Sequence, residues 1–201
     1  MKILKKLLGK LIRILYRFVY RFIPCQEKTI LFISFHGRGY SDNPMAIHQY
    51  LSKHSQYADY RCIYAIKNHK QKKLKIENAR IIEYFSIAYF FYLARSKYWI
   101  ANCKLPKYVL KKDSQVYLQT WHGTPLKKLA HDIEVPEGTT FYRSEMSVEE
   151  MRSTYDNDVS KYNYMISPSA FTTEVFQSAF AIERERLIET GYPRNDILSN
   201  Y

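Results

Sequence analysis

The chain has 201 residues, which allows one well-buried domain and is short for two. Hydrophobic residues make up 46% and charged residues 25%, a balance typical of a globular protein and not of a disordered one. Its three cysteines are far apart and form no CxxC pair, which argues against a disulfide framework and a structural zinc site and favours a reducing compartment such as the cytoplasm. The net charge is +12.

Most of that charge belongs to residues 1–24, the first predicted unit. Seven basic residues and no acidic one lie between residues 1 and 23, which leaves +5 for the rest of the chain and argues against a general nucleic-acid binder. On a helical wheel of about 100° per residue, six of these cations share one stripe of roughly 100°. They are Lys2, Lys6, Lys10, Arg13, Arg17 and Arg21.

The opposite side of this predicted helix is apolar, and Pro24 ends the pattern. Charges that recur every three or four positions exclude a membrane-spanning helix and a secretory signal. We expect an amphipathic helix in the membrane interface, with Lys6, Lys10, Arg13, Arg17 and Arg21 toward anionic headgroups. The alternative is a helix packed on its own domain. The apolar side holds Leu4, Leu7, Leu8, Leu11, Ile14, Leu15, Phe18 and Phe22.

Residues 25–201 form the second predicted unit, in which short apolar runs alternate with helical patterns. The runs predict strands at 29–35, 60–66, 79–85, 98–102, 115–121, 164–167 and 186–190. Helices are predicted after an Asp42 or Asn43 cap with Pro44 in the first turn, at 86–97, at 147–158 with Ser147 as cap, and at 168–180. Strands separated by helices indicate an α/β domain with one parallel sheet.

Two glycines follow the first predicted strand, in HGRGYSDNP (36–44). Gly37 and Gly39 give G-x-G, but Asp42 stands where a dinucleotide fingerprint needs its third glycine, so we expect no nicotinamide or flavin cofactor. Close approach of the backbone to a phosphate at the following helix N-terminus remains possible, as does a plain strand-to-helix turn.

A histidine leaves the strand at 115–121, in QTWHGTPLKKLAHDI (119–133). Thr124 can cap a helix with Pro125 in its first turn, which would also hold Lys127 and Lys128. Cations are unfavourable at a helix N-terminus, so this predicts a bound anion. Ligands bind beyond the carboxyl ends of parallel strands, which favours a functional His122 over a structural one.

The other histidines have no carboxylate or cysteine partners at metal-ligand spacing, so no metal is predicted. His36 and His131 could approach the same cleft. The chain has no G-x-S-x-G elbow, Walker loop or kinase motif set.

Four motifs, GYSDNP, QTWHGTPLKKL, ISPSAFTTEVF and TGYPRNDIL, resemble the CDP-glycerol glycerophosphotransferase family of teichoic acid synthesis, over roughly residues 28–198. The resemblance implies a Rossmann-like domain that is the N-terminal half of a GT-B fold, on a peripheral protein at the cytoplasmic face of the cell membrane. It also implies that His122 is the catalytic base. We assign acceptor and phosphate binding to Gly37, Gly39, Tyr40, Asp42, Asn43, Asn102, Trp121, Gly123, Thr124, Lys127, Lys128 and Arg194.

The chain ends at Tyr201, just past GYPRND, where the resemblance places the linker to a donor domain. We therefore expect an acceptor half, inactive alone, of an enzyme that transfers glycerol phosphate from CDP-glycerol to a glycerol-phosphate or lipid-linked acceptor and releases CMP. The expected partners are CDP-glycerol through that second domain, the lipid-linked acceptor and the anionic membrane, but not nucleic acid. The alternatives are a non-catalytic, membrane-bound acceptor-binding module and a GT-B transferase of ribitol phosphate or a sugar.

Overall fold

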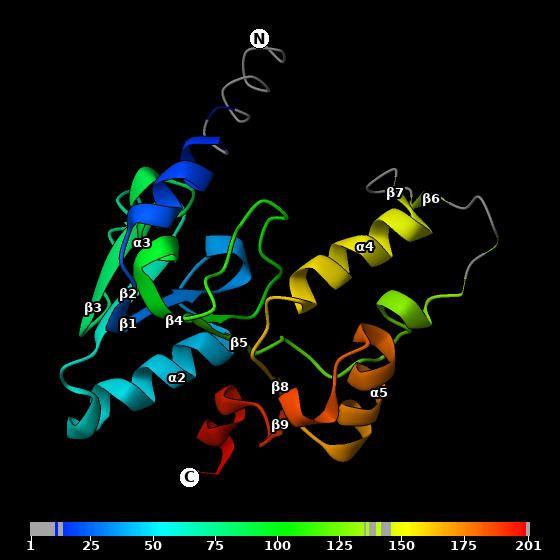
Figure 1. The fold of residues 1–201 in the computed structure, drawn as a ribbon. Helices are drawn as coiled ribbons and strands as arrows, with labels where there is room; N and C mark the ends of the chain where they lie inside the picture. The colour runs from blue at the N-terminus through cyan, green and yellow to red at the C-terminus, as the bar shows by residue number, and fades with distance from the viewer. Residues whose placement is uncertain (1–10, 12–13, 135, 137–139, 142–145, 200–201) are drawn as a thin grey trace.

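The computed structural model describes residues 11, 14–134, 136, 140–141 and 146–199 (Figure 1). Four residues of the predicted cationic stripe, Lys2, Lys6, Lys10 and Arg13, lie outside these ranges. The apolar positions Leu4, Leu7 and Leu8 do so as well.

Seven parallel strands form one sheet in the order β3-β2-β1-β4-β5-β8-β9 (Figure 1). A strand lies at each of the seven predicted places, so the prediction of an α/β domain with a single parallel sheet is confirmed. The strands are β1 (Gln26–Ile33), β2 (Arg61–Ile66), β3 (Ala79–Glu83), β4 (Ser96–Ala101), β5 (Val116–Gln119), β8 (Tyr164–Ser167) and β9 (Leu187–Glu189).

Four helices connect these strands: α2 (Asp42–Lys53), α3 (Ile87–Arg95), α4 (Val148–Val159) and α5 (Ala170–Phe180). Ser147 caps α4 as predicted, within a capping box in which Ser147 and Glu150 bind each other's backbone N–H. The sequence patterns missed one small feature, an antiparallel pair formed by β6 (Thr140–Phe141) and β7 (Met146–Ser147) just before α4.

Both faces of the sheet are buried, which explains the continuous apolar runs. In β1, Leu31 and Ile33 belong to the core that includes residues of α3 and α5, whereas Ile30 and Phe32 face the opposite core, against which residues of α2 pack. The chain runs outward from β1 through β2 and β3, and α3 then returns it to β4 beside β1. This reversal between β1 and β4 is where an open parallel sheet offers a ligand-binding crevice.

Two predicted helix starts are wrong. Neither Asp42 nor Asn43 caps α2: Ser41 is the N-cap residue and makes no side-chain cap bond, while Asp42 has φ 62° and directs its carboxylate to other partners. No helix begins at Thr124 and Pro125. Leu126 is 94% exposed there, and the chain instead crosses from the end of β5 to the 3-10 turn η3 (Ala130–Asp132) beside α5 (Figure 1). Lys127 and Lys128 therefore lie in no first helical turn, and the helix-dipole argument for an anion beside them fails.

The N-terminal segment is helical at residues 14–22 and contacts the domain along one side. Tyr16 and Tyr20 are buried with Ala94 of α3, and the Tyr16 hydroxyl donates a hydrogen bond of 3.2 Å to the carbonyl oxygen of Leu110. The other side is apolar and exposed, through Leu11, Ile14, Leu15, Phe18 and Phe22. Among the described residues, no helix has the length and apolar character needed to cross a membrane.

Gly37 has a packing role that the sequence does not reveal. Its φ is 79°, and an added Cβ would lie 2.7 Å from both Cβ and Cγ of Tyr84. Because a side chain would meet both backbone strain and a clash, we expect Gly37→Ala to destabilise the fold by about 2–4 kcal/mol in urea unfolding. Gly39→Ala is the matched control, since nothing lies within 4 Å of the added Cβ there, and it should cost less than about 1 kcal/mol. Equal losses in both variants would contradict this role.

Candidate functional site

Asn102 organises a cluster of polar groups at the β1–β4 reversal. It is fully buried and directly follows β4. Its side-chain Oδ1 accepts a hydrogen bond from the backbone N–H of Phe35 at 2.7 Å, and its Nδ2 donates to Oδ2 of Asp42 at 2.5 Å. Its backbone carbonyl oxygen lies 2.8 Å from Nδ1 of His122. One asparagine thus connects the ends of β1 and β4, the start of α2 and the segment after β5.

The contact to Asn102 determines which nitrogen of His122 carries the proton in the neutral ring. A carbonyl oxygen can only accept, so Nδ1 must donate, and Nε2 then keeps its lone pair. The ring is also stacked on Trp121, with centroids 4.5 Å apart and planes at 28°. Trp121 is buried at a φ of 51° and packs against Phe176 and Phe180 of α5. The imidazole is therefore held from two sides while the residue stays exposed.

Arg194 closes the cluster from the C-terminal end of the chain, in η5 (Pro193–Leu198). Its guanidinium forms an ion pair with Asp42, whose side chain is 5% exposed, and donates to the backbone carbonyl of His122 at 3.0 Å. Its backbone N–H donates to Oδ1 of Asn43 at 3.2 Å. The Asn43 amide in turn donates to the carbonyl oxygens of Thr120 and Trp121. Asp42 thus has a charged partner and a buried position, which accounts for its departure from the capping role.

The cluster holds six of the predicted site residues: Asp42, Asn43, Asn102, Trp121, His122 and Arg194. Gly123 and Thr124 lie next to it, beside Tyr192. The other predicted residues have different surroundings. Gly37 packs on Tyr84, and the Tyr40 hydroxyl is bound to Nδ1 of His48 at 2.8 Å. A Cβ added at Gly39 would have no atom within 4 Å, Lys127 is exposed, and Lys128 pairs with Glu134 at 2.6 Å.

Of four further residues around this cluster, the sequence predicts only His36. Phe35 touches the His122 ring at a centroid distance of 6.0 Å, and its neighbour His36 follows at φ 56°. Lys67 directly follows β2, and Lys104 follows β4 by three residues. The signal was available for the two lysines. Lys67 directly follows the predicted strand at 60–66, and Lys104 comes two residues after the predicted strand at 98–102, at the same edge as His122.

The electrostatics of this edge are positive. Partial burial, followed by the charges of Lys67, Arg38, Lys104 and His122, lowers the pKa of His36. Burial also lowers the pKa of Lys104, and the nearby Asp158 opposes that effect. Asp158 is itself buried, which raises its pKa to about 6. A cluster of cations with little counter-charge favours an anionic ligand at the carboxyl edge of the sheet.

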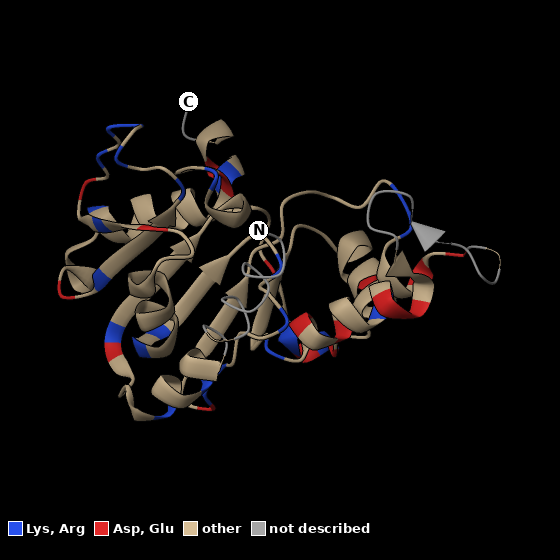
Figure 2. Cartoon of the chain, turned by 90° about the horizontal axis from the view of Figure 1, so that it is seen from above, with Lys and Arg blue, Asp and Glu red and all other residues tan. Residues whose placement is uncertain are grey.

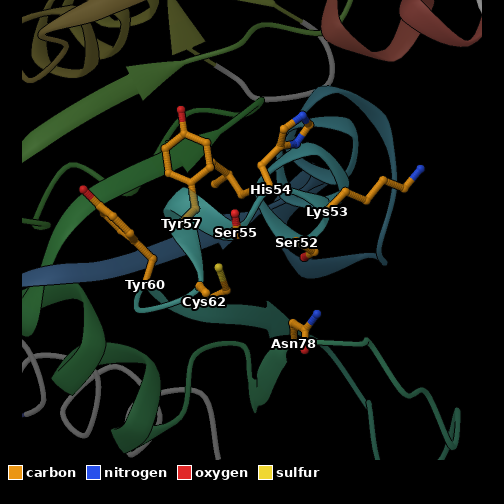
Figure 3. A pocket seen from close by; sticks show the side chains of 10 residues that line it. Ser52, Lys53, His54, Ser55, Tyr57, Tyr60, Cys62 and Asn78 are labelled. Carbon is orange, nitrogen blue, oxygen red and sulfur yellow. The ribbon is translucent and has the colours of Figure 1, made fainter.

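A cavity of about 410 Å³ lies at the opposite edge, where β2 and β3 begin (Figure 3). It is lined by the end of α2 and the following turn, including His54, Tyr57 and Tyr60, and by Asn78 just before β3. The His54 ring stacks on Tyr50 at 4.0 Å and its Nδ1 contacts the Tyr50 carbonyl oxygen at 2.7 Å, so its ring is engaged locally. This cavity is separate from the His122 cluster, because the two occupy opposite ends of the strands.

A comparison with models of protein families shows to which family the chain belongs. Residues 14–201 match the model described as CDP-Glycerol:Poly(glycerophosphate) glycerophosphotransferase. The chain belongs to this family. The match spans the whole sheet and every residue of the His122 cluster, so the resemblance noted in the four sequence motifs is confirmed.

Curated members of the family give the same result. The chain is 40% identical over 175 residues to a teichoic acid poly(glycerol phosphate) polymerase of Staphylococcus epidermidis, covering 86% of this chain and 23% of that protein. It is 39% identical over 179 residues to the polymerase of Bacillus spizizenii, covering 88% and 43%. A teichoic acid glycerol-phosphate transferase of Staphylococcus aureus is 37% identical, at 85% and 42%. The chain thus spans less than half the length of these glycerophosphotransferase relatives.

Solved structures agree with the fold. The chain superposes on the wall teichoic acid polymerase TagF with a TM-score of 0.84 and 36% identity, covering 94% of this chain and 44% of that one. A TagF variant in which a histidine is replaced by asparagine, soaked with CDPG, gives a TM-score of 0.83. The α/β domain with one parallel sheet is therefore similar to part of the TagF structure.

Proposed function

We propose that this chain forms the acceptor side of a glycerophosphotransferase, with His122 as the general base. In this proposal the domain is one half of a GT-B fold, and CDP-glycerol binds to a second domain facing it. Family membership supports the reaction class. The single observation that carries the residue assignment is the hydrogen bond from Nδ1 of His122 to the Asn102 carbonyl oxygen, which leaves Nε2 free to accept a proton.

The chemistry follows from that tautomer. An acceptor hydroxyl attacks the phosphorus that joins glycerol phosphate to CMP, and Nε2 of His122 takes the hydroxyl proton as the new oxygen–phosphorus bond forms. The bond to CMP breaks, and CMP leaves with the electron pair. Since the attacked phosphorus is surrounded by anionic oxygens, the reaction needs positioning and charge neutralisation as well as a base. The lysines at that edge, Lys67 and Lys104, would supply that neutralisation.

Two other functions remain as alternatives. A transferase of ribitol phosphate or a sugar could use the same base. It would differ from our proposal in the donor substrate, which would not be CDP-glycerol. A non-catalytic acceptor-binding module would need no oriented imidazole. The hydrogen bonds that connect Asn102, His122 and Arg194 favour the enzyme over the module.

Calorimetry on residues 1–201 tests which ligand this domain binds. A soluble glycerol-phosphate acceptor analogue should bind saturably, because the His122 cluster belongs to this chain. CDP-glycerol or CDP-ribitol at millimolar concentration should give no saturable heat, because the nucleotide contacts are assigned to the second domain. Micromolar binding of CDP-glycerol with no binding of the acceptor analogue would reverse the assignment of the two ligands.

We also propose that the N-terminal helix anchors the protein peripherally at the cytoplasmic face of the cell membrane, where a lipid-linked acceptor would be presented. The helix leaves Leu11, Ile14, Leu15, Phe18 and Phe22 exposed, while Arg17 and Arg21 are also accessible. Exposed apolar and cationic side chains on one short helix are the combination that binds an anionic bilayer interface.

Charge reversal tests this anchor. Replacing Lys6, Lys10, Arg13 and Arg17 with glutamate should lower co-sedimentation with vesicles containing anionic lipid at least tenfold, since each basic residue near the headgroups contributes about 1 kcal/mol. Four glutamates at Lys70, Lys72, Lys73 and Lys75, in the basic loop after β2, provide a control with the same net charge. If both quadruple variants sediment like the original protein at low and high salt, the helix does not anchor the chain.

A further inference from the structure

A basic pocket opens at the carboxyl edge of the sheet, next to the His122 cluster. Its volume is about 860 Å³. One wall is formed by residues that follow four strands: His36 after β1, Lys67 after β2, Phe85 after β3 and Lys104 after β4. The opposite wall comes from α4. Phe35, which touches the His122 ring, directly precedes His36, so the pocket adjoins the site of the proposed base.

Three lysines line this pocket: Lys67, Lys104 and Lys107. Among the residues that the structure describes, no carboxylate lines it. Across the part of the chain that the structure describes, none of the three forms an ion pair. The four acidic residues of α4, Glu149, Glu150, Asp156 and Asp158, are not among the residues that line the pocket; Figure 2 marks the acidic and basic residues along the chain.

Neutral groups hold these lysines in place. Nζ of Lys104 donates to Oγ1 of Thr154 at 3.2 Å and lies 3.5 Å from the centroid of the Tyr155 ring. Nζ of Lys107 donates to Oγ of Ser153 at 3.2 Å. Nζ of Lys67 lies 5.1 Å from the centroid of Tyr84. Hydroxyl and aromatic partners orient an ammonium group but leave its charge uncompensated.

Asp158, the acid whose charge acts on Lys104, already has two hydrogen-bond donors. Oδ1 of Asp158 accepts the backbone N–H of Leu105 at 3.0 Å, and Oδ2 accepts the hydroxyl of Tyr162 at 2.5 Å. It is 1% exposed and lies behind the pocket wall, where its charge attracts Lys104 only from a distance. The positive charge of the pocket is therefore not compensated by these described residues. A phosphate group, with its negative charge and several acceptor oxygens, would compensate it.

The remaining lining narrows the chemistry of the ligand. Phe85, Leu105, Pro106, Ile133 and Met151 present apolar surface beside the three amines. A free inorganic anion would leave that surface unused. A ligand that carries a phosphate or diphosphate on an apolar or carbon-rich body would fill both parts of the pocket.

We propose that this pocket binds a phosphate of the acceptor, at a place separate from the acceptor hydroxyl that His122 deprotonates. The proposal rests on the function proposed above, because it takes the ligand of this chain to be the acceptor. Held by Lys67, Lys104 and Lys107, that phosphate fixes the direction in which the acceptor leaves the reaction centre. Two parts of an acceptor could provide this phosphate: the diphosphate of a lipid carrier, or an internal phosphodiester of a glycerol phosphate polymer.

Calorimetry with residues 1–201 tests the pocket through binding alone. Inorganic pyrophosphate should bind saturably, and Lys67→Met and Lys104→Met should each weaken it about tenfold, the loss of one charge-assisted hydrogen bond. Lys75→Met is the matched control. Lys75 belongs to the same β2–β3 loop as Lys67, but it is exposed and lies close to the start of β3, at the other end of the strands. Circular dichroism and melting curves confirm that each variant is folded.

Titrations with two further compounds identify which part of the acceptor provides the phosphate. Tighter binding of farnesyl diphosphate than of pyrophosphate indicates a lipid carrier, and tighter binding of a tri(glycerol phosphate) indicates the polymer. His122→Ala should leave pyrophosphate affinity within about twofold, so loss of the proposed base and loss of the pocket give different signatures. The proposal is overturned if none of the three compounds binds at millimolar concentration, or if Lys67→Met and Lys104→Met bind pyrophosphate as Lys75→Met does.

Discussion

His122→Ala should lower kcat for glycerol phosphate transfer by about 10²- to 10⁴-fold, the contribution typical of a general base. The variant keeps the backbone that Arg194 and Asn43 hold, because both bind main-chain carbonyl groups of the segment after β5. The affinity for the acceptor should change far less than kcat, since the lost interaction is made in the transition state. The measurement is the steady-state rate of CMP release, made on this domain together with the proposed donor domain, so that the sample transfers glycerol phosphate.

The control for this experiment is another histidine. His131 pairs with Asp156 of α4 at 2.6 Å and belongs to no part of the His122 cluster, so His131→Ala should keep kcat within about threefold. Circular dichroism must show both variants folded. Full activity of His122→Ala would make His122 a structural residue and would remove the base from the proposed mechanism.

Arg194→Met should destabilise the protein by about 2–3 kcal/mol. The substitution leaves the carboxylate of Asp42, 5% exposed, without its charged partner, and breaking a buried pair in this way costs about 3–5 kcal/mol when both groups are buried. The Arg194 side chain is 32% exposed, which reduces the expected loss. Urea unfolding measures the change in the free energy of unfolding.

A double substitution tests the cause. Asp42→Asn removes the stranded charge, so Arg194→Met should cost at least 1 kcal/mol less in that background than in the original protein. Arg184→Met is the matched control. Its ion pair with Glu189 is 3.4 Å long and solvent-exposed, and its loss should cost less than about 1 kcal/mol. Additive losses for Asp42→Asn and Arg194→Met would mean that the pair does not hold the cluster together.

The strands and most helices could be predicted because their signals are local. Both faces of the sheet are buried, so β1, β2 and β4 appear as continuous apolar runs whose limits are fixed within a few residues. Ser147 followed by Glu150 is a capping box that depends on four consecutive residues. His122 could be selected because a parallel sheet places its ligands at strand ends.

The errors come from contacts between distant parts of the chain. Asp42 is a residue type that commonly caps helices, yet its carboxylate pairs with Arg194, which lies 152 residues later in the chain. The segment after His122 has cap and proline signals for a helix, but it must cross to α5, and Ala130 rather than Leu126 becomes buried. The pocket shared by Lys104 and Lys107 could not be predicted from strand ends alone, because α4, which completes it, lies far along the sequence.

The measurement that most directly tests the account is the protonation of the two ring nitrogens of His122, by ¹⁵N NMR of the labelled chain at pH 8, where an unperturbed imidazole is neutral. We expect Nδ1 to carry the proton that is donated to Asn102 and Nε2 to show the chemical shift of an unprotonated nitrogen. Asn102 contributes a backbone carbonyl here, so its substitution by Ala should keep this pattern if the segment stays folded. A proton on Nε2 with Nδ1 bare would contradict the account, because His122 could then not accept the acceptor's proton at that atom.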